Sequence, residues 1–480
     1  MSTHAIVIGG GANELVAAHY LARAGRNVIL LDTQASHEEA GWIPPQIVRD
    51  LGLDRAGLAV ARPDPWLTIP LPGGGQLALA QDAAQSTEAI RRVSRHDADR
   101  WPAFCTRMAR LARVLEALYV APPPDPLDRG FGALVRQAPL ALRFRRLGRE
   151  GIADLLRVLP MPVADLLDDW FETDALKGAL GAMAIRHLRH GPRAGGTAYT
   201  LLHQHVGSPP GVFRSASSNV VRVLAGLPGI EIRRDAEISA IDVRAGRVAG
   251  VTLATGEHIA ASTVVSGMDP RHTLLGLVDA GWLDPDLTYA LRNIRSGGVT
   301  ARVTLTLDRP AGFDALAVAP SLDYLDRASD DAKYGRVSQQ PFLEAHVADR
   351  TPVGSHRLEV HVQYAPYALA DGEWDTSRRG ALGNLVVHEL AQHLPGGDAG
   401  VTERSVLTPR DLEGTAGWPE GQPHHAELAL DQFLWMRPVP ALARYRSPLP
   451  GLYLCGPAMH PGGGIVGAAG ANAVREILGS

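Results

Sequence analysis

The spacing of hydrophobic positions changes along the chain and divides it into segments of different expected structure. A short apolar run over 5–8 ends in glycines, a helical pattern follows from Glu14 to Ala24, and a second apolar run over 27–31 ends at Asp32. Short β-branched runs predict buried strands, and the 3.6-residue period between them predicts a helix. The first 32 residues are therefore expected to form a strand, turn, helix, strand unit.

The middle of the chain alternates between helical and extended patterns. Helices are predicted over 43–53, over 86–120 as two helices with Pro102 opening the second, over several shorter stretches of 127–188, and over 382–393. Alternation predicts a hairpin over 63–79, a three-stranded meander over 230–266, and strands over 301–307 and 357–364. The C-terminus returns to the first pattern, with a strand over 451–456, a glycine-rich loop and a helix over 465–478.

The glycines after the first strand suggest a nucleotide site. Gly9 permits a tight turn, Gly11 permits close approach of a pyrophosphate to the helix N-terminus, and Asp32, which follows Gly11 by 21 positions, suits a ribose diol. The third glycine of the G-x-G-x-x-G pattern is replaced by Glu14, whose carboxylate would repel phosphate. Dinucleotide binding and a nucleotide-free structural unit both remain open at this point, and Asp32 would also suit NAD.

Composition narrows the class of protein. The 480 residues carry a net charge of −4, with 45% hydrophobic side chains, so a nucleic-acid partner is not expected. Cys105 and Cys455 are far apart, which favours a reducing compartment and argues against a dithiol centre. No apolar run reaches 18 residues and no secretory signal opens the chain, so a cytoplasmic location is expected. Contact with a membrane surface stays open.

Several segments together resemble the phytoene-desaturase-like flavoproteins, the carotenoid and retinoid oxidoreductase group of FAD-dependent amine-oxidase-type enzymes. They are Gly9 to Asp32, Arg49-Asp-Leu-Gly-Leu53, Val264-Val-Ser-Gly-Met-Asp-Pro270, the segment 424–432, and above all Gly451-Leu-Tyr-Leu-Cys-Gly-Pro-Ala-Met-His-Pro-Gly-Gly-Gly-Ile-Val-Gly-Ala468. The resemblance implies FAD as cofactor and hydride transfer between flavin and a hydrophobic polyene, isoprenoid or lipid-like substrate in an apolar tunnel. The enzyme would act on C–C or C–H bonds.

The resemblance also implies the fold. We expect an α/β chain with a Rossmann-like FAD-binding domain of the glutathione-reductase type and an inserted α+β substrate domain. The predicted FAD-binding domain is discontinuous and comprises residues 1–75, 195–275 and 405–480. The predicted substrate domain, with a helical layer, comprises residues 76–194 and 276–404.

The sequence departs from this family on its phosphate-binding side. Relatives carry a Gly-Gly pair after the acid that ends the second strand, whereas here Asp32 is soon followed by the helix over 43–53. Glu14, Glu38 and Glu39 add negative charge in the same region, and the Asn-Ala expected before Asp269 is Gly-Met. An alternative therefore stays open, in which FAD is held weakly or has been lost and the old cavity serves a non-redox enzyme or a binding protein.

Candidate site residues follow from these motifs. His460 lies in the loop expected to face the flavin and is the first candidate for proton handling, with a purely structural role as the alternative. His203, predicted to lie on a strand with His205, and Arg214 are candidates for the substrate side. No histidine pair has an acid or cysteine at ligand spacing, so no metal is predicted. The predicted cofactor-binding residues are Gly9, Gly11, Ala12, Asp32, Gly456, Gly463, Gly464, Ile465 and Val466.

Overall fold

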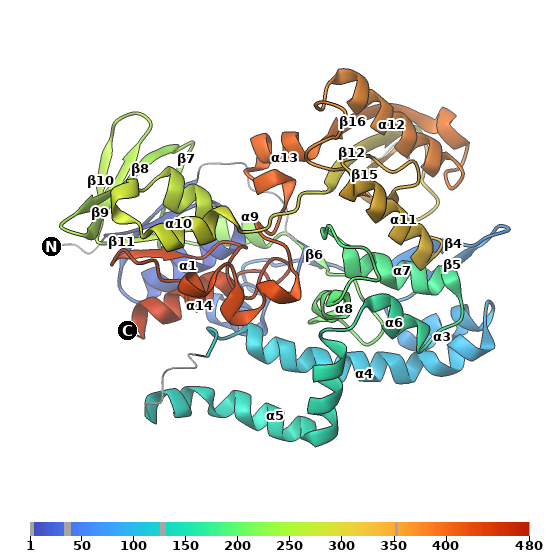
Figure 1. Cartoon of the computed structure of the whole chain (residues 1–480), viewed down its shortest axis with the longest axis horizontal. Coiled ribbons are helices and arrows are strands. Elements are labelled where there is room, and N and C mark those ends of the chain that lie inside the picture. The colour runs from blue at the N-terminus through green and yellow to red at the C-terminus, as the bar shows by residue number, and fades with distance from the viewer. Residues whose placement is uncertain (1–3, 33–39, 125–130, 351–353, 480) are drawn as a thin grey trace.

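A computed structural model describes residues 4–32, 40–124, 131–350 and 354–479. Its first sheet is parallel, with the strand order β17-β11-β1-β2-β7. The predicted strand, turn, helix, strand unit is confirmed as β1, α1 and β2, and α14 at the C-terminus packs against α1 (Figure 1). The elements are β1 (His4–Ile8), α1 (Ala12–Arg23), β2 (Asn27–Asp32), β7 (Glu231–Arg234), β11 (Thr263–Ser266), β17 (Leu452–Leu454) and α14 (Ala468–Leu478).

The predicted meander is only partly correct. Strands β8 (Ile238–Arg244), β9 (Arg247–Leu253) and β10 (His258–Ala260) form an antiparallel sheet of their own. The next extended residues, β11, pair instead with β1 in the parallel sheet, with Val264 opposite Ile6. Val264, Val265 and Ser266 are all buried, which suits a strand covered on both faces.

A second large sheet has the order β16-β12-β15-β14-β13-β4-β5 and is antiparallel except between β13 and β4. One face of it is apolar and packs under α12 (Thr376–Ala391), because Val303, Leu305 and Leu358 alternate with polar neighbours. The predicted hairpin over 63–79 is confirmed as β4 and β5. The strands are β4 (Leu67–Pro70), β5 (Gln76–Leu79), β12 (Thr300–Leu307), β13 (Ala315–Val318), β14 (Phe342–Arg350), β15 (His356–Gln363) and β16 (Val401–Leu407).

A helical layer lies beside this second sheet (Figure 1). Its longest straight member is α4, and the prediction that Pro102 opens a helix is wrong, because Ser94 caps α4 and Pro102 lies inside it. The prediction that His203 and His205 lie on a strand is also wrong, because both belong to α8. The layer comprises α3 (Ala83–Arg91), α4 (Arg95–Tyr119), α5 (Phe131–Val158), α6 (Val163–Asp168), α7 (Asp174–Ile185) and α8 (Thr197–His205).

Short elements complete the fold. The predicted helix over 43–53 is confirmed as α2 (Pro45–Leu51), with proline at its start. Within the described residues, no helix combines the length and apolar content needed to cross a membrane. The remaining elements are β3 (Val60–Ala61), β6 (Ser217–Ser218), α9 (Val220–Ala225), η1 (His272–Gly276), η2 (Ala280–Trp282), α10 (Pro285–Arg292), α11 (Leu322–Lys333), η3 (Gly397–Gly400), α13 (Pro409–Ala416), η4 (Pro419–Gly421), η5 (Leu430–Gln432), η6 (Leu434–Met436) and η7 (Pro440–Leu442).

Candidate functional site

The turn between β1 and α1 has the geometry expected of a phosphate-binding turn. Gly9 adopts a φ of 111° and donates its N–H to the carbonyl of Leu31 at 2.8 Å. A Cβ at position 10 would lie 2.3 Å from Oδ1 of Asp32, so only glycine fits there. Gly11 caps α1 without a side-chain hydrogen bond. The acid at the end of β2 therefore lies directly against the glycine turn.

Glu14 does not extend freely toward this turn. Its side chain is 5% exposed and packs between Gly9 and Gly267, the residue that follows β11. A Cβ on Gly267 would lie 1.7 Å from Oε1 of Glu14, and Sγ of Cys455 is 4.0 Å from the same oxygen. Two departures from the family pattern, Glu14 and Gly267, are thus in contact, and the carboxylate occupies space that a side chain at 267 would need. Glu38 and Glu39 lie outside the described residues.

The loop between β17 and α14, residues 455–467, is called the C-terminal loop here, and it folds back onto the segment that precedes α2. The N–H of Trp42 donates to the carbonyl of Gly464 at 2.9 Å, and the N–H of Val466 donates to the carbonyl of Trp42 at 2.8 Å. The last helix begins at Ala468 and not at Ile465 as predicted, because Gly467 caps it with a φ of 76°. Ile465 and Val466 therefore belong to the loop before the helix, and no helix N-terminus lies at Ile465.

One cavity of about 1750 Å³ joins these parts. It runs from the glycine turn, past Met268 and the C-terminal loop, to the second sheet. Its volume exceeds the roughly 300–1,000 Å³ typical of pockets for one small ligand, which leaves room for a cofactor and a substrate together. Among the predicted cofactor residues, the cavity is lined by Gly9, Gly11, Gly463, Gly464, Ile465 and Val466.

His460 lies within the C-terminal loop, but its ring points toward α4 and does not line the cavity. Its side chain is fully buried, its Nε2 is 3.0 Å from the carbonyl of Leu118 in α4, and its own carbonyl accepts a hydrogen bond from Tyr445. Burial lowers the pKa of His460 to about 4 and keeps the ring neutral. The structure therefore corrects the proton-handling hypothesis and gives His460 the alternative, structural role of fixing the loop to α4.

His203 supports the same loop from another side. Its Nε2 lies 2.8 Å from the carbonyl of Gly463, and its Nδ1 lies 2.8 Å from the hydroxyl of Tyr119, which is buried in α4. Burial lowers the pKa of His203 to about 4, so the neutral ring accepts from Tyr119 and donates to Gly463. The prediction placed His203 on the substrate wall, but its ring lies behind the loop and outside the cavity lining.

Arg214, a predicted residue of the substrate side, lines the cavity. Its guanidinium lies 3.1 Å from Oε1 of Glu344, while Arg186 lies 3.1 Å from the other carboxylate oxygen. Glu344 is completely buried in β14, and both arginines line the cavity. Burial raises the pKa of Glu344, but the two guanidiniums outweigh burial and lower it to about 2. The sequence offered no local motif for Arg186 or Glu344.

A row of histidines continues the cavity wall. The rings of His424 and His187 meet edge to face at 5.2 Å, and those of His187 and His361 at 4.7 Å. His424 also packs against the C-terminal loop, since a Cβ on Gly463 would lie 1.7 Å from its Nδ1. Its Nε2 is buried and has no hydrogen-bond partner in the described part of the chain. The resemblance over 424–432 pointed to this segment, but no spacing rule singled out His424.

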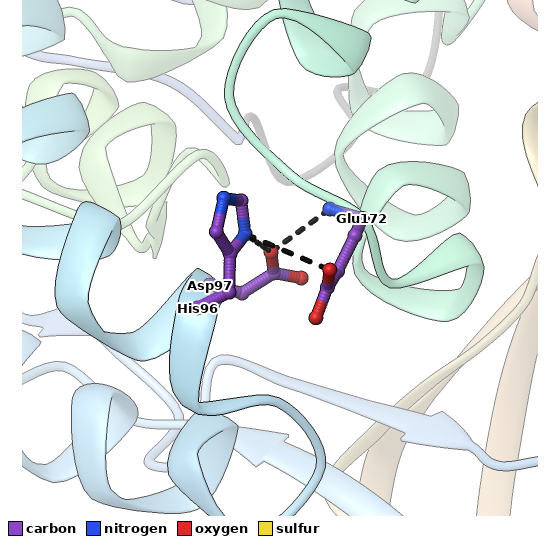
Figure 2. A group of neighbouring side chains, drawn as sticks. All are labelled: His96, Asp97 and Glu172. Atoms are coloured by element: carbon purple, nitrogen blue, oxygen red, sulfur yellow. Dashed lines mark hydrogen bonds and ion pairs between the residues drawn. The ribbon is translucent and has the colours of Figure 1, made fainter.

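A separate group resembles a metal site at first sight. His96, Asp97 and Glu172 converge between α4 and the start of α7, as Figure 2 shows. The carboxylate of Asp97 already accepts the N–H groups of Glu172 and Thr173 at 2.8 and 2.9 Å, and Ser94 donates to Glu172 at 2.7 Å. These bonds join the two helices, so we assign the group a structural role.

Solved structures with the same architecture show which fold the chain adopts. A putrescine oxidase variant matches over 100% of this chain and 99% of its own, with a TM-score of 0.62 and 13% identity. The fold is thus the FAD-binding α/β fold with a substrate domain. The family model described as flavin containing amine oxidoreductase matches residues 46–478. The chain therefore belongs to the flavin containing amine oxidoreductase family.

Three relatives illustrate the range of this similarity. The chain is 31% identical to pyridine nucleotide-disulfide oxidoreductase domain-containing protein 2 of Rattus norvegicus, over 99% of this chain and 93% of that protein. It is 26% identical to a limonene dehydrogenase component of Castellaniella defragrans, over 98% and 94%, and 26% identical to phytoene desaturase (neurosporene-forming) of Rhodobacter capsulatus, over 51% and 48%. The carotenoid resemblance is therefore real but distant and not specific.

The alignment with the rat relative contains positions that this chain lacks. It spans 540 positions, and 540 − 480 leaves at least 60 positions without a counterpart in this chain. The residues that are present still fit a dinucleotide such as FAD. Glycines of the turn after β1 and of the C-terminal loop line the cavity, and Oδ1 of Asn13, in the first turn of α1, is buried without a hydrogen-bond partner among the described residues.

Proposed function

We propose that the chain is an FAD-dependent oxidoreductase whose substrate lies between the C-terminal loop and the second sheet. The observation that carries this proposal is the single cavity that connects the glycine turn after β1 with Gly463 to Val466 and with the polar face of that sheet. Parallel sheets of this type bind ligands at the carboxyl ends of their strands, where β1 and β11 end here. Membership of the flavin family supports FAD as the cofactor.

Of the predicted residues, those that line the cavity would hold FAD. Gly9 and Gly11 would receive the phosphates, and the four residues 463–466 would lie toward the ring. Ala12, Asp32 and Gly456 do not line the cavity, and the carboxylate of Asp32 would meet the ribose next to Gly10. When bound, FAD accepts a hydride from a substrate carbon, and the substrate's remaining proton must pass to a protein base or to water.

His424 is our candidate for handling that proton, in place of His460. Its Nε2 is buried, lacks a hydrogen-bond partner among the described residues, and belongs to a ring that packs on Gly463 at the cavity. Burial, reinforced by the nearby Arg437, lowers the pKa of His424 and keeps the imidazole neutral. A neutral imidazole can accept a proton at Nε2. The row through His187 to His361 fixes its orientation.

The cavity wall differs from the apolar substrate tunnel that the family resemblance implies. The cavity wall includes Arg186, His187, Arg302, Glu359 and His361, which hydrogen-bond or carry charge. Such a wall favours a substrate with polar groups near the reacting carbon. The names of two relatives, a limonene dehydrogenase component and a phytoene desaturase, favour the hydrophobic isoprenoid or polyene as a second candidate. Whether a C–H bond next to carbon or next to nitrogen is oxidised depends on which candidate is correct.

The absorption spectrum of the purified protein tests the proposal. After incubation with excess FAD and gel filtration, we expect flavin bands that correspond to about one FAD per chain. Glu14→Gln keeps the shape of the side chain and removes its charge, and we expect about tenfold tighter FAD binding from the lost repulsion of the diphosphate. Glu88→Gln, an exposed change in α3, is the control and should leave FAD binding unchanged.

The alternative, a family member that has lost FAD, predicts a different result. The protein would stay colourless after incubation with FAD, and neither Glu14→Gln nor Glu14→Gly would change this. Tight binding of NAD without flavin would instead support a nicotinamide dehydrogenase. A large gain of flavin in the Glu14 variants would reject the loss of FAD, because the rest of the site would then be intact.

A further inference from the structure

The cavity face of the second sheet is polar along three neighbouring strands. Arg302 on β12 and Glu344 on β14 both lie directly opposite His361 on β15. One step further along the sheet, His346 on β14 lies opposite Glu359 on β15. Because side chains alternate between the faces of a strand, these five residues share one face, while Val360 and Val362 face the apolar side under α12.

Three guanidiniums converge on this face from three different elements. Arg186 follows α7, Arg214 precedes β6, and Arg302 is on β12; all three line the cavity. Arg186 and Arg214 each lie 3.1 Å from a carboxylate oxygen of buried Glu344. Neither oxygen of Glu344 makes a hydrogen bond of good geometry among the described residues, and Nε of Arg186 makes none either. Arg302 lies 3.7 Å from Glu359 and 5.4 Å above the ring of Trp418.

We call Arg186, Arg214, Arg302, Glu344 and Glu359 the arginine wall. It has three positive and two negative charges, and the neighbouring histidines do not change this balance. Burial, together with these guanidiniums, lowers the pKa of His346 to about 4 and that of His361 to about 3, so both rings are neutral. Toward the rim, Arg350 pairs with Asp314, and Arg357 and Asp349 are exposed. These five residues by themselves therefore carry one excess positive charge, and Glu413 and Glu420 also line the cavity.

We propose that the arginine wall binds a carboxylate group of the substrate. A partly buried excess charge is unfavourable unless an anion balances it. The planar fork of a guanidinium matches a carboxylate with two hydrogen bonds. Trp418 beside Arg302 offers an aromatic surface to the organic part of the same molecule. The inference that this carboxylate belongs to the enzyme's substrate rests on the proposed function, whereas binding of the carboxylate itself does not.

Calorimetric titration with matched probes tests this assignment. The FAD-incubated protein is titrated with benzoate, with its neutral counterpart benzamide, and with acetate and decanoate against their amides. We expect at least one carboxylate to bind at least tenfold more tightly than its amide, with the difference shrinking as salt is added. Arg302→Gln should remove most of this preference. Because Arg302 is partly exposed, its replacement leaves buried Glu344 in contact with Arg186 and Arg214, and the protein should stay folded.

Arg404→Gln is the matched control. Arg404 lies on the neighbouring strand β16, and its side chain packs on Gly383 of α12, on the face away from the cavity. The control should keep the full preference for carboxylate. Thermal unfolding of both variants establishes that they are folded, and Arg302→Lys should recover part of the preference.

Two results would overturn the assignment. One is that no carboxylate binds better than its amide; the other is that the preference survives in Arg302→Gln. Repeating the titration without FAD distinguishes failure of the arginine wall to bind carboxylate from failure of the proposed function. A protein that prefers carboxylate but takes up no flavin would retain the arginine wall as a binding site and lose the oxidoreductase assignment.

Discussion

A Cβ at Gly267 would lie 1.7 Å from Oε1 of Glu14, so these two residues, one at the end of β11 and one in the first turn of α1, cannot both carry side chains in this arrangement. Each departs from the pattern of the family that the chain resembles. Because Glu14 is packed against Gly267 and Gly9, its carboxylate is part of the protein's packing and not only an obstacle to phosphate. The pair is best understood as one coupled change.

This coupling predicts a non-additive double-mutant cycle. Gly267→Ala in the natural chain should destabilise the protein by about 1–3 kcal/mol, because the added methyl overlaps Glu14. In a Glu14→Gly background the same substitution should cost much less, and the coupling free energy should exceed about 1 kcal/mol. Urea denaturation of the four proteins measures it. Additive effects would show that Glu14 moves away from Gly267 at no cost.

The contact between His203 and Gly463 predicts a role in holding the flavin-facing loop. Tyr119→Phe removes the donor to Nδ1 of His203, so the ring is less firmly held with its Nε2 toward the carbonyl of Gly463. We expect FAD affinity to fall about three- to tenfold, the value of a neutral hydrogen bond, with a shift in the bound flavin spectrum.

Tyr324→Phe is the control for this effect. Tyr324 in α11 is also a buried tyrosine, but it donates to the carbonyl of Pro341 and contacts neither His203 nor the C-terminal loop. It should lower stability and leave the affinity of the folded protein for FAD unchanged. Equal losses of FAD affinity in both variants would mean that Tyr119 acts through general packing alone.

Replacing Glu344 is expected to cause a large loss of stability. Glu344→Gln leaves Arg186 and Arg214 next to each other without the carboxylate that holds them, and breaking a buried ion pair in this way costs about 3–5 kcal/mol. Glu359→Gln disrupts only the more exposed pair with Arg302 and should cost less than about 1 kcal/mol. Urea denaturation compares them. Equal costs would mean that Glu344 is not the charge centre of the wall.

The buried histidines predict a loss of stability in acid. The pKa of His203, His425 and His460 is lowered to about 4 by burial, whereas the unfolded chain titrates near 6.5. Each therefore contributes stability that is complete above pH 6.5 and is lost as the pH falls toward 4. Between pH 7.5 and pH 5 the expected loss is about 2 kcal/mol per histidine.

His460→Gln isolates one of these contributions. The amide can still donate to the carbonyl of Leu118 but does not titrate, so the unfolding free energy of the variant should fall about 2 kcal/mol less than that of the natural chain over the same pH range. His258→Gln, a change at the surface, should show the full dependence. An unchanged slope in His460→Gln would indicate that His460 is protonated without unfolding.

Sequence predicts local elements better than their partners. The unit from β1 to β2 and the hairpin of β4 and β5 follow from apolar periods and turn glycines within a few residues. The alternation over 263–266 correctly indicated a strand, but it could not show that this strand pairs with β1. His203 and His205 are two positions apart, which suggested one face of a strand, while the surrounding packing made α8 from the same residues.

The same limit applies to the site. Gly9, Gly463 and Gly464, which line the cavity, could be predicted because glycine in a turn next to a ligand has a local signature. Arg186, Arg302, Glu344 and His361 were missed because they come together only through strand pairing in the second sheet, and each is unremarkable within its own segment. His460 was chosen for its place in a motif, but its ring turns toward α4 and away from the cavity.

Comparative binding of FAD, ADP and FMN tests the central claim most directly. If one cavity holds the dinucleotide from the glycine turn to the C-terminal loop, FAD contacts both ends at once. FAD should then bind at one per chain and at least about 100-fold more tightly than ADP or FMN, because linked groups bind cooperatively. Flavin fluorescence and competition by ADP measure this. FAD that binds no more tightly than ADP would contradict the claim, because the C-terminal loop would then contribute nothing to flavin binding.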